Sequence, residues 1–221
     1  MRFACGGVGV GEGEDGGMGG LRNKEMKRYL IRVNLMPYMK DYTRGKRVMH
    51  IDTSQKLYER RDTGIAFKII RTKEHKGLAL SLKLKREFER ELDAQYDYSR
   101  IYAICIYYLI KDELDNFDEL IICGDESFID VKEYLSLLFS GNETYNKKSI
   151  RSIYELRIET GDKNLRSYAD DIAYSYMRRA LRSISRRQKG IPLNVVKVTY
   201  SMICEKWMEI EAKIKNNKGG G

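Results

Sequence analysis

The sequence predicts an α/β domain with a mixed five-stranded sheet flanked by helices. Three strand-like segments joined by short connections come first, and such connections favour antiparallel neighbours. Helical and strand-like segments then alternate, which is typical of strands that join a sheet through helices. A further segment with helical spacing follows at the C-terminal end and adds an extra helix to the domain.

The first three strands are predicted between residues 46 and 84. Lys46 to Asp52 and Gly64 to Arg71 have strand character, and the second segment is rich in β-branched and aromatic residues. Thr72 to Gly77 is a polar turn. From Leu78 to Leu84 every second residue is leucine, and this alternation indicates a half-buried third strand.

Helical character follows. Lys85 to Ala94 and Arg100 to Leu114 combine helix formers with long apolar stretches, so helix is expected in two pieces. Glu119 to Cys123 is short, and after Glu119 it is continuously apolar. That pattern predicts a fourth strand in the centre of the sheet, buried on both faces.

One more helix and one more strand complete the predicted sheet. Ser127 can cap a helix from Phe128 to Phe139. Residues 140–148 are predicted as a loop. Ile150 to Thr160 returns to strand character before a break that begins at Gly161, and we expect the fifth strand there.

Two helices end the predicted fold. Between Leu165 and Ile184 apolar residues recur at three- and four-residue spacing, which makes the clearest helical stripe in the chain. A short valine-rich stretch, Val195 to Val198, leads into a last helix that carries Ile203 and Trp207. We expect this last helix to pack on the domain or on a partner.

The two ends of the chain differ from its centre. Nine of the first twenty residues are glycine, and ordering them would cost backbone entropy with little apolar surface to bury. We therefore predict a disordered leader over residues 1–22, a single domain with its C-terminal helix over residues 23–215, and a flexible tail over residues 216–221.

The charge of the chain favours a polyanionic partner. Lys and Arg number 41 against 32 Asp and Glu, a net charge of +9, and such an excess is typical of nucleic-acid binding. The four cysteines are scattered, so neither a zinc site nor a disulfide framework is indicated. The longest apolar run is about half a membrane span. We expect a cytoplasmic protein without membrane contact.

The order of elements resembles that of the ribonuclease H-like superfamily, which includes RuvC-type resolvases, and the resemblance covers residues 46–188. In that superfamily an Asp lies on the first strand, a second acid ends the fourth strand and a third lies on the last helix. The matching residues here are Asp52 of Ile51-Asp52-Thr53-Ser54, Asp125 of Cys123-Gly124-Asp125-Glu126, and Asp170 of Ala169-Asp170-Asp171-Ile172-Ala173.

The resemblance implies that Asp52, Asp125 and Asp170 are catalytic and bind metal. Asp171 is the alternative to Asp170, because helical phase does not decide between them. Ribonuclease H proper has a fourth acid on its first helix. Glu87 is our choice for that ligand, and the competing candidates are Glu91 and Glu126.

Three converging acids also have a physical meaning of their own. Two divalent cations about 4 Å apart need several carboxylate oxygens at one place. The acids therefore predict Mg²⁺ or Mn²⁺ as cofactor, and a metal-dependent nuclease or resolvase-like phosphodiesterase that acts on DNA or RNA. A resolvase would need a homodimer to cut two strands symmetrically.

Basic residues crowd the end of the acid-bearing helix and predict where a phosphate backbone lies. They are Arg178, Arg179, Arg182, Arg186, Arg187 and Lys189. The alternative function is a non-catalytic ribonuclease H-like protein that binds nucleic acid or serves as a scaffold, in which the acids are structural.

Overall fold

The computed structural model describes residues 43, 45–92, 97–124, 126–182 and 194–219. The chain divides into two compact units, residues 1–44 and 45–221. Every helix and strand given below belongs to the second unit. The predicted leader, residues 1–22, lies outside the described residues.

The second unit contains a five-stranded mixed sheet with the order β3-β2-β1-β4-β5. Its first three strands pair antiparallel, and β4 and β5 join them parallel to β1. The strands are β1 Val48–Thr53, β2 Thr63–Ile69, β3 His75–Leu80, β4 Glu119–Ile122 and β5 Ser149–Ser152. The predicted α/β class and mixed sheet are thus confirmed.

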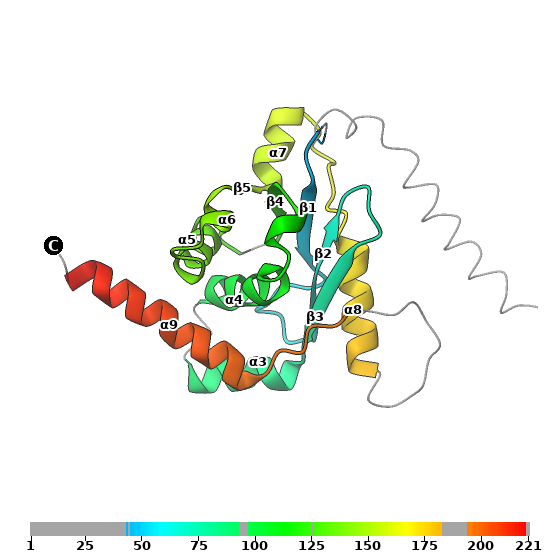
Figure 1. Cartoon of the computed structure of the whole chain (residues 1–221). Helices are drawn as coiled ribbons and strands as arrows, with labels where there is room; N and C mark the ends of the chain where they lie inside the picture. The colour runs from blue at the N-terminus through cyan, green and yellow to red at the C-terminus, as the bar shows by residue number, and fades with distance from the viewer. Residues whose placement is uncertain (1–42, 44, 93–96, 125, 183–193, 220–221) are drawn as a thin grey trace, which may run out of the picture. The chain divides into compact units, whose positions relative to one another are not determined.

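Helices cover both faces of this sheet (Figure 1). On one face α8 packs across β2, β3 and β1, and on the other α4 separates the sheet from α5 and α9. The helices are α3 Leu82–Glu91, α4 Tyr98–Ile110, α5 Phe128–Leu138, α6 Glu143–Asn146, α7 Ile153–Thr160, α8 Asp170–Arg182 and α9 Tyr200–Gly219, with a 3-10 turn, η2, at Leu114–Asn116.

The central strand β1 shows how the sequence builds these layers. Side chains alternate between the faces of a strand. Met49 and Ile51 belong to the large core that includes α4, whereas the ring of His50 packs edge-on against Tyr168, just before α8. Asp52 continues the His50 face, so its carboxylate lies on the same side of the sheet as α8.

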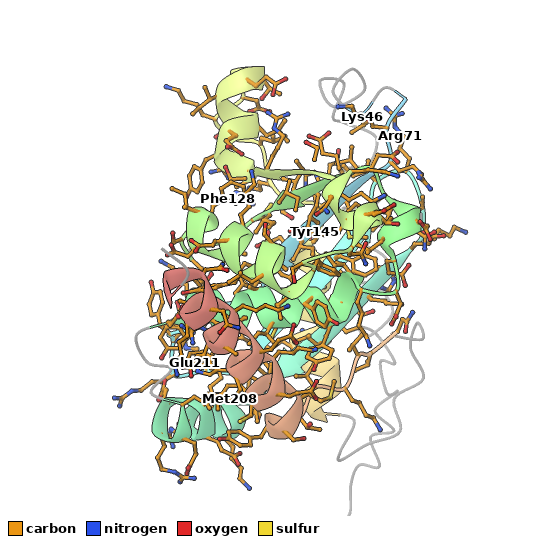
Figure 2. The ribbon with its side chains drawn as sticks, turned by 60° about the vertical axis from the view of Figure 1, so that its left-hand side comes forward. Lys46, Arg71, Phe128, Tyr145, Met208 and Glu211 are labelled. Carbon is orange, nitrogen blue, oxygen red and sulfur yellow. The ribbon has the colours of Figure 1, made fainter. Side chains whose placement is uncertain are left out.

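The C-terminal helix packs on the domain itself. Helix α9 lies against α4 and α5, as Figure 2 shows with Glu211 and Met208 labelled along it. Arg100 of α4 joins the helices: its guanidinium lies 4.1 Å from the ring centre of Trp207 and forms an ion pair with Glu211 at 3.4 Å. The helix also runs to Gly219, so residues 216–219, predicted as tail, are helical.

The third strand ends earlier than predicted. It stops at Leu80, and Leu82 and Leu84 belong to α3. The cause is Ser81, whose side chain accepts a hydrogen bond from the Leu84 backbone N–H at 3.2 Å and caps the helix. The local cap therefore overrides the alternation of leucines.

The predicted fifth strand is also wrong over most of its length. Strand β5 covers only Ser149–Ser152, and α7 follows at once. Ser152 and Glu155 form a reciprocal capping box, which starts the helix. Since α7 lies at the surface, Ile158 is 83% exposed, so its apolar side chain was a misleading signal for a buried strand.

Smaller differences concern loops and helix limits. The predicted loop at residues 140–148 contains the short helix α6. In the valine-rich stretch before α9, Val195 forms an isolated parallel bridge with Gly77. Leu165 precedes α8 rather than starting it. Among the residues that the structure describes, no helix combines the length and the apolar character that crossing a bilayer requires.

Candidate functional site

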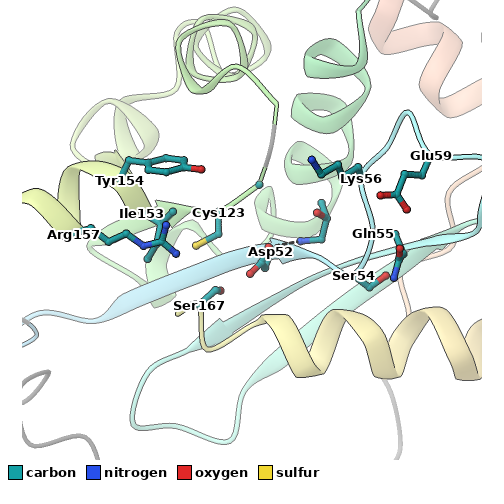
Figure 3. Close-up of a pocket in the computed structure, with 12 residues that line it drawn as sticks. Asp52, Ser54, Gln55, Lys56, Glu59, Cys123, Ile153, Tyr154, Arg157 and Ser167 are labelled. Carbon is teal, nitrogen blue, oxygen red and sulfur yellow. Dashed lines mark hydrogen bonds between the residues drawn. The ribbon is translucent and has the colours of Figure 1, made fainter. Parts of the chain in front are cut away.

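A polar pocket of about 330 Å³ lies where the parallel strands β1 and β4 end (Figure 3). In open α/β sheets, ligands commonly bind outside the carboxyl ends of such strands. The lining residues come from the β1 end and its loop, from the β4 end, from α7 and from the segment before α8. They are Asp52, Thr53, Ser54, Gln55, Lys56, Glu59, Cys123, Gly124, Ile153, Tyr154, Arg157 and Ser167.

Asp52 occupies the centre of this site (Figure 3). It is half-buried, and its Oδ1 accepts a hydrogen bond from the Thr53 backbone N–H at 2.7 Å. The β1–β4 pairing aligns Ile51 with Ile122, so Cys123 is the next residue beside Asp52. The residue predicted as the first acid therefore lines the pocket.

Cys123 is held in place by the helix beneath the sheet. The hydroxyl of Tyr102 in α4 donates to the Cys123 carbonyl oxygen at 2.5 Å. Burial is the main reason that the pKa of the Cys123 thiol is raised, and the negative charge of Asp52 adds to it. The thiol therefore stays protonated near neutral pH, which argues against a cysteine nucleophile.

The loop between β1 and β2 forms one wall of the pocket and is fixed through its backbone. Ser54 and Gly64 exchange hydrogen bonds across its base. The backbone N–H of Leu57 donates to Glu126 at 3.3 Å. Glu126, one candidate for a fourth metal ligand, thus anchors this loop.

A buried lysine holds the same loop from α3. The ammonium of Lys85 donates to the carbonyl oxygens of Leu57 at 2.8 Å and Glu59 at 2.6 Å, and to the Thr63 hydroxyl at 3.1 Å. Burial lowers the pKa of Lys85, and nearby carboxylates, first that of Glu89, oppose this effect. The lysine is structural, because its donors are used by two backbone carbonyl oxygens and the Thr63 hydroxyl.

Helix α7 supplies the wall opposite that loop (Figure 3). The Arg157 guanidinium lies 5.3 Å from the ring centre of Tyr154. Its Nε donates to the Leu165 carbonyl oxygen at 3.0 Å, which fixes the side chain. The pocket is therefore lined by two cationic side chains, Lys56 and Arg157, and by the anionic side chains of Asp52 and Glu59.

Asp170 and Asp125 complete the predicted acid trio. Asp170 is the exposed first residue of α8, outside the pocket lining. Its charge nevertheless contributes, together with that of Asp52, to the raised pKa of Cys123, so both carboxylates lie within electrostatic reach of one thiol. Asp171 follows on α8 and is exposed too. Asp125 lies outside the described residues.

Glu87 does not join this group. It lies on α3 and lines a different cleft, together with Leu82, Lys83, Arg86 and Arg90. Glu91, on the same helix, pairs with Arg90 at 2.7 Å. The structure therefore places Glu87 beside basic residues of α3, apart from the residues that line the pocket around Asp52.

The predicted basic cluster is described only in part. Arg178 is exposed on α8, and its guanidinium lies 5.7 Å from the ring centre of Tyr174. Arg179 and Arg182 are residues of the same helix. The remaining predicted contacts, Arg186, Arg187 and Lys189, lie outside the described residues.

The donor chemistry at the β1 end suits a hard cation. Asp52 and Asp170 offer carboxylate oxygens, which Mg²⁺ and Mn²⁺ prefer, while the protonated thiol of Cys123 is a poor ligand. Within the described ranges, no three His, Cys, Asp or Glu side chains are close enough to hold an ion. A complete site would therefore need Asp125, which is not among the described residues.

Comparison of the chain with protein-family models, with curated proteins and with solved structures found no match. The interpretation of the site therefore depends on its own geometry.

Several pocket residues were not predicted from the sequence as part of the site. Tyr154 and Arg157 were assigned to a strand, and Lys56 and Glu59 fall between the first two predicted strands. The available signal was their place in the chain, because residues that follow β1 and β5 gather at the same edge of a parallel sheet. Ser167 had no such signal, since only the packing of the segment before α8 brings it to the pocket.

Proposed function

We propose that this chain is a divalent-metal-dependent phosphodiesterase of the ribonuclease H-like fold, a nuclease or resolvase-like enzyme that acts on nucleic acid. The strand order β3-β2-β1-β4-β5, with three antiparallel strands followed by two parallel ones, supports that fold. So does the placement of α4 and α8 on opposite faces of the sheet.

The observation that carries the proposal is the position of Asp52. It lies at the end of the central strand, in a polar pocket that also contains two cationic side chains, Lys56 and Arg157. Asp170 begins the helix that packs on the same face. Acids at the end of a central strand beside cations suit a reaction at a phosphate group.

Each residue has a distinct role in this proposal. Asp52 and Asp170, with Asp125, would hold Mg²⁺ or Mn²⁺. Bound there, the cations would activate a water molecule and stabilise the leaving oxygen of the phosphodiester. Lys56 and Arg157 would orient the phosphate, because their positive charge complements its negative oxygens.

The pocket also limits the chemistry open to the protein. Cys123 is protonated and almost fully buried, so a thiolate reaction is disfavoured. His50 is fully buried, and burial lowers its pKa to about 3, so it cannot serve as a general base at the pocket. The polar groups left at the pocket include carboxylates, cations and the hydroxyl groups of Thr53, Ser54 and Ser167.

Cleavage of labelled DNA, RNA, hybrid and four-way-junction substrates with Mg²⁺ or Mn²⁺ tests the proposal. Asp52→Asn should reduce cleavage roughly a hundredfold or more while substrate binding is kept, because the amide retains the bond to Thr53 but loses the charge. Asp130→Asn is the matched control, since it makes the same charge change on the exposed start of α5.

Two further variants separate the helix acids. Asp170→Asn should abolish cleavage and Asp171→Asn should not, if Asp170 is the third ligand. Cleavage by Asp52→Asn at the wild-type rate would refute the metal-dependent mechanism. If the wild type binds nucleic acid in a salt-sensitive way but does not cleave it, the result would instead support the non-catalytic nucleic-acid-binding function. The described residues, in which only Asp52 and Asp170 represent the predicted acid trio, are compatible with that function too.

A further inference from the structure

An aromatic ring and a guanidinium group enter the pocket together from α7. Figure 3 shows Tyr154 and Arg157 on one side of Asp52, with Lys56 and Gln55 on the other. Tyr154 and Arg157 are three residues apart, which puts them on one face of the helix. The pair therefore faces the same space as the proposed catalytic acid.

Arg157 is positioned in a way that suits an anion. The bond from its Nε to the Leu165 carbonyl oxygen fixes the plane of the guanidinium. Within the part of the chain that the structure describes, its two Nη groups have no hydrogen-bond partner. A guanidinium fixed in this way can donate two parallel bonds to one phosphate.

Tyr154 is unusual for an aromatic residue in this domain. Most of the tyrosines in the described helices are at least half-buried, whereas Tyr154 is 57% exposed. A single exposed ring is common on protein surfaces, but this one lines a polar pocket beside a cation. Such a ring can stack on a nucleobase, and the base must be unpaired to reach it.

A second ring lies near the opposite wall. The ammonium of Lys56 is 5.4 Å from the ring centre of Tyr58, and Tyr58 is 52% exposed. Cation and aromatic side chains therefore occur together on both sides of Asp52. This arrangement is typical of surfaces that follow a single strand, with cations for the backbone and rings for the bases.

We propose that Tyr154 and Arg157 form a subsite for an unpaired nucleotide next to the phosphate that is cut, with the base stacked on Tyr154 and its phosphate bound by Arg157. The inference deepens the proposed function and rests on it. It identifies the substrate as nucleic acid with single-stranded character at the cut, because a base inside an intact duplex cannot reach the ring.

The test measures binding rather than cleavage. Asp52→Asn protein without divalent metal is titrated into single-stranded DNA that carries one 2-aminopurine, and into the same DNA in a duplex. Stacking on tyrosine quenches 2-aminopurine fluorescence, and anisotropy of a second label reports binding. We expect quenching with the single strand and tighter binding of the single strand than of the duplex.

Variants on α7 identify the ring. Tyr154→Ala should remove the quenching and weaken single-strand binding roughly tenfold to a hundredfold, whereas Tyr154→Phe should retain both. Arg157→Met should weaken binding and reduce its salt dependence. Ile158→Ala is the matched control, because it removes an exposed apolar side chain from the same helix without altering the pocket lining.

The outcomes separate this inference from the proposed function. Full quenching after Tyr154→Ala, or binding by the Asp52→Asn protein that shows no quenching, overturns the subsite while metal-dependent cleavage still stands. Equal affinity for single strand and duplex also overturns it. If Tyr154→Ala loses the quenching but the wild type cleaves no substrate, the subsite is supported and the proposed phosphodiesterase activity is rejected. Failure to bind either form of the DNA overturns the subsite, and the cleavage panel then decides separately on the proposed function.

Discussion

Gly64 of β2 lies so close to Ala173 of α8 that a Cβ atom at position 64 would come within 2.1 Å of the Ala173 carbonyl oxygen. The backbone amide of Met177 is also near, at 2.8 Å from that position. Only glycine lets the helix approach the sheet to this distance. The place of α8, and of Asp170 at its start, therefore depends on missing side chains in the sheet, and Gly77 of β3 makes a similar close approach to Tyr176 of α8.

Gly64→Ala should destabilise the domain by about 3 kcal/mol, at the upper end for overpacking, because backbone rather than a flexible side chain must move. Cleavage should fall as well, since α8 is displaced. Urea unfolding measures the first effect. Gly141→Ala is the control: that residue has φ +80 with open space around it, so only about 1 kcal/mol of backbone strain is expected. An equal cost at both positions would contradict the close-packing explanation.

The stability of the domain should fall as the pH is lowered from 6.5 towards 3, because of His50. Burial lowers the pKa of His50 from 6.5 to about 3, so in this range the unfolded chain binds a proton that the folded chain does not. Each pH unit then costs about 1.4 kcal/mol for this group. Unfolding by urea at several pH values measures the slope.

His50→Leu should reduce that slope and stabilise the domain in mild acid. Neither ring nitrogen of His50 has a hydrogen-bond partner in the described structure, so an apolar side chain of similar size loses no bond there. His75→Gln provides the comparison: burial lowers the pKa of His75 as well, but this side chain is only half-buried and lies 3.0 Å from the Tyr176 hydroxyl, so a smaller reduction of the slope is expected. An unchanged slope in His50→Leu would assign the acid sensitivity to other groups.

Arg100→Lys should loosen the contact between α4, α5 and α9 and cost about 2 kcal/mol. The guanidinium lies between the rings of Tyr134 and Trp207, at 5.2 and 4.1 Å from their centres, and an ammonium cannot stack on both. Trp207 is the one tryptophan of the chain, so its fluorescence follows unfolding directly. Arg90→Ala, at an exposed site, should leave the midpoint unchanged; a similar shift there would point to general charge effects.

Cys123→Ala should retain metal-dependent cleavage although the thiol lies beside Asp52. Burial raises the pKa of the thiol, so it takes no part as a thiolate, and the loss is confined to about 1 kcal/mol of packing. In the native protein, alkylation should modify Cys204 before Cys105 and Cys123, because the latter two are buried. Peptide mass spectrometry measures the order. Loss of cleavage in Cys123→Ala with an intact fold would require a different mechanism.

The order of elements could be predicted from sequence because it depends on local patterns. The continuous apolar run before Cys123 marked β4, and Ser127 marked the start of α5. The errors occurred where two local signals compete. Leucines that alternate up to position 84 suggest a strand, but the Ser81 cap starts a helix that includes the last two of them. In the same way, the capping box of Ser152 and Glu155 starts α7 within the segment predicted as the fifth strand.

The site was less accessible to such reasoning. Asp52 could be found because it ends a recognisable strand. Arg157 and Ser167 reach the pocket only through tertiary packing, which no spacing in the sequence records. Glu87 was misplaced for a different reason. Its helix was predicted, but the sequence did not indicate how that helix is oriented relative to the sheet, so Glu87 was expected at the wrong cleft.

The hydrogen bonds of Lys85 have a consequence for how this pocket can change. They reach the carbonyl groups of Leu57 and Glu59, and Glu126 holds the Leu57 amide, so the course of the loop is set by main-chain atoms. Substitutions at Gln55, Lys56 or Glu59 can therefore change the side chains that line the pocket without changing the path of the loop backbone. Selectivity can diverge at these positions while the scaffold remains constant, which makes them the natural place to redesign substrate preference.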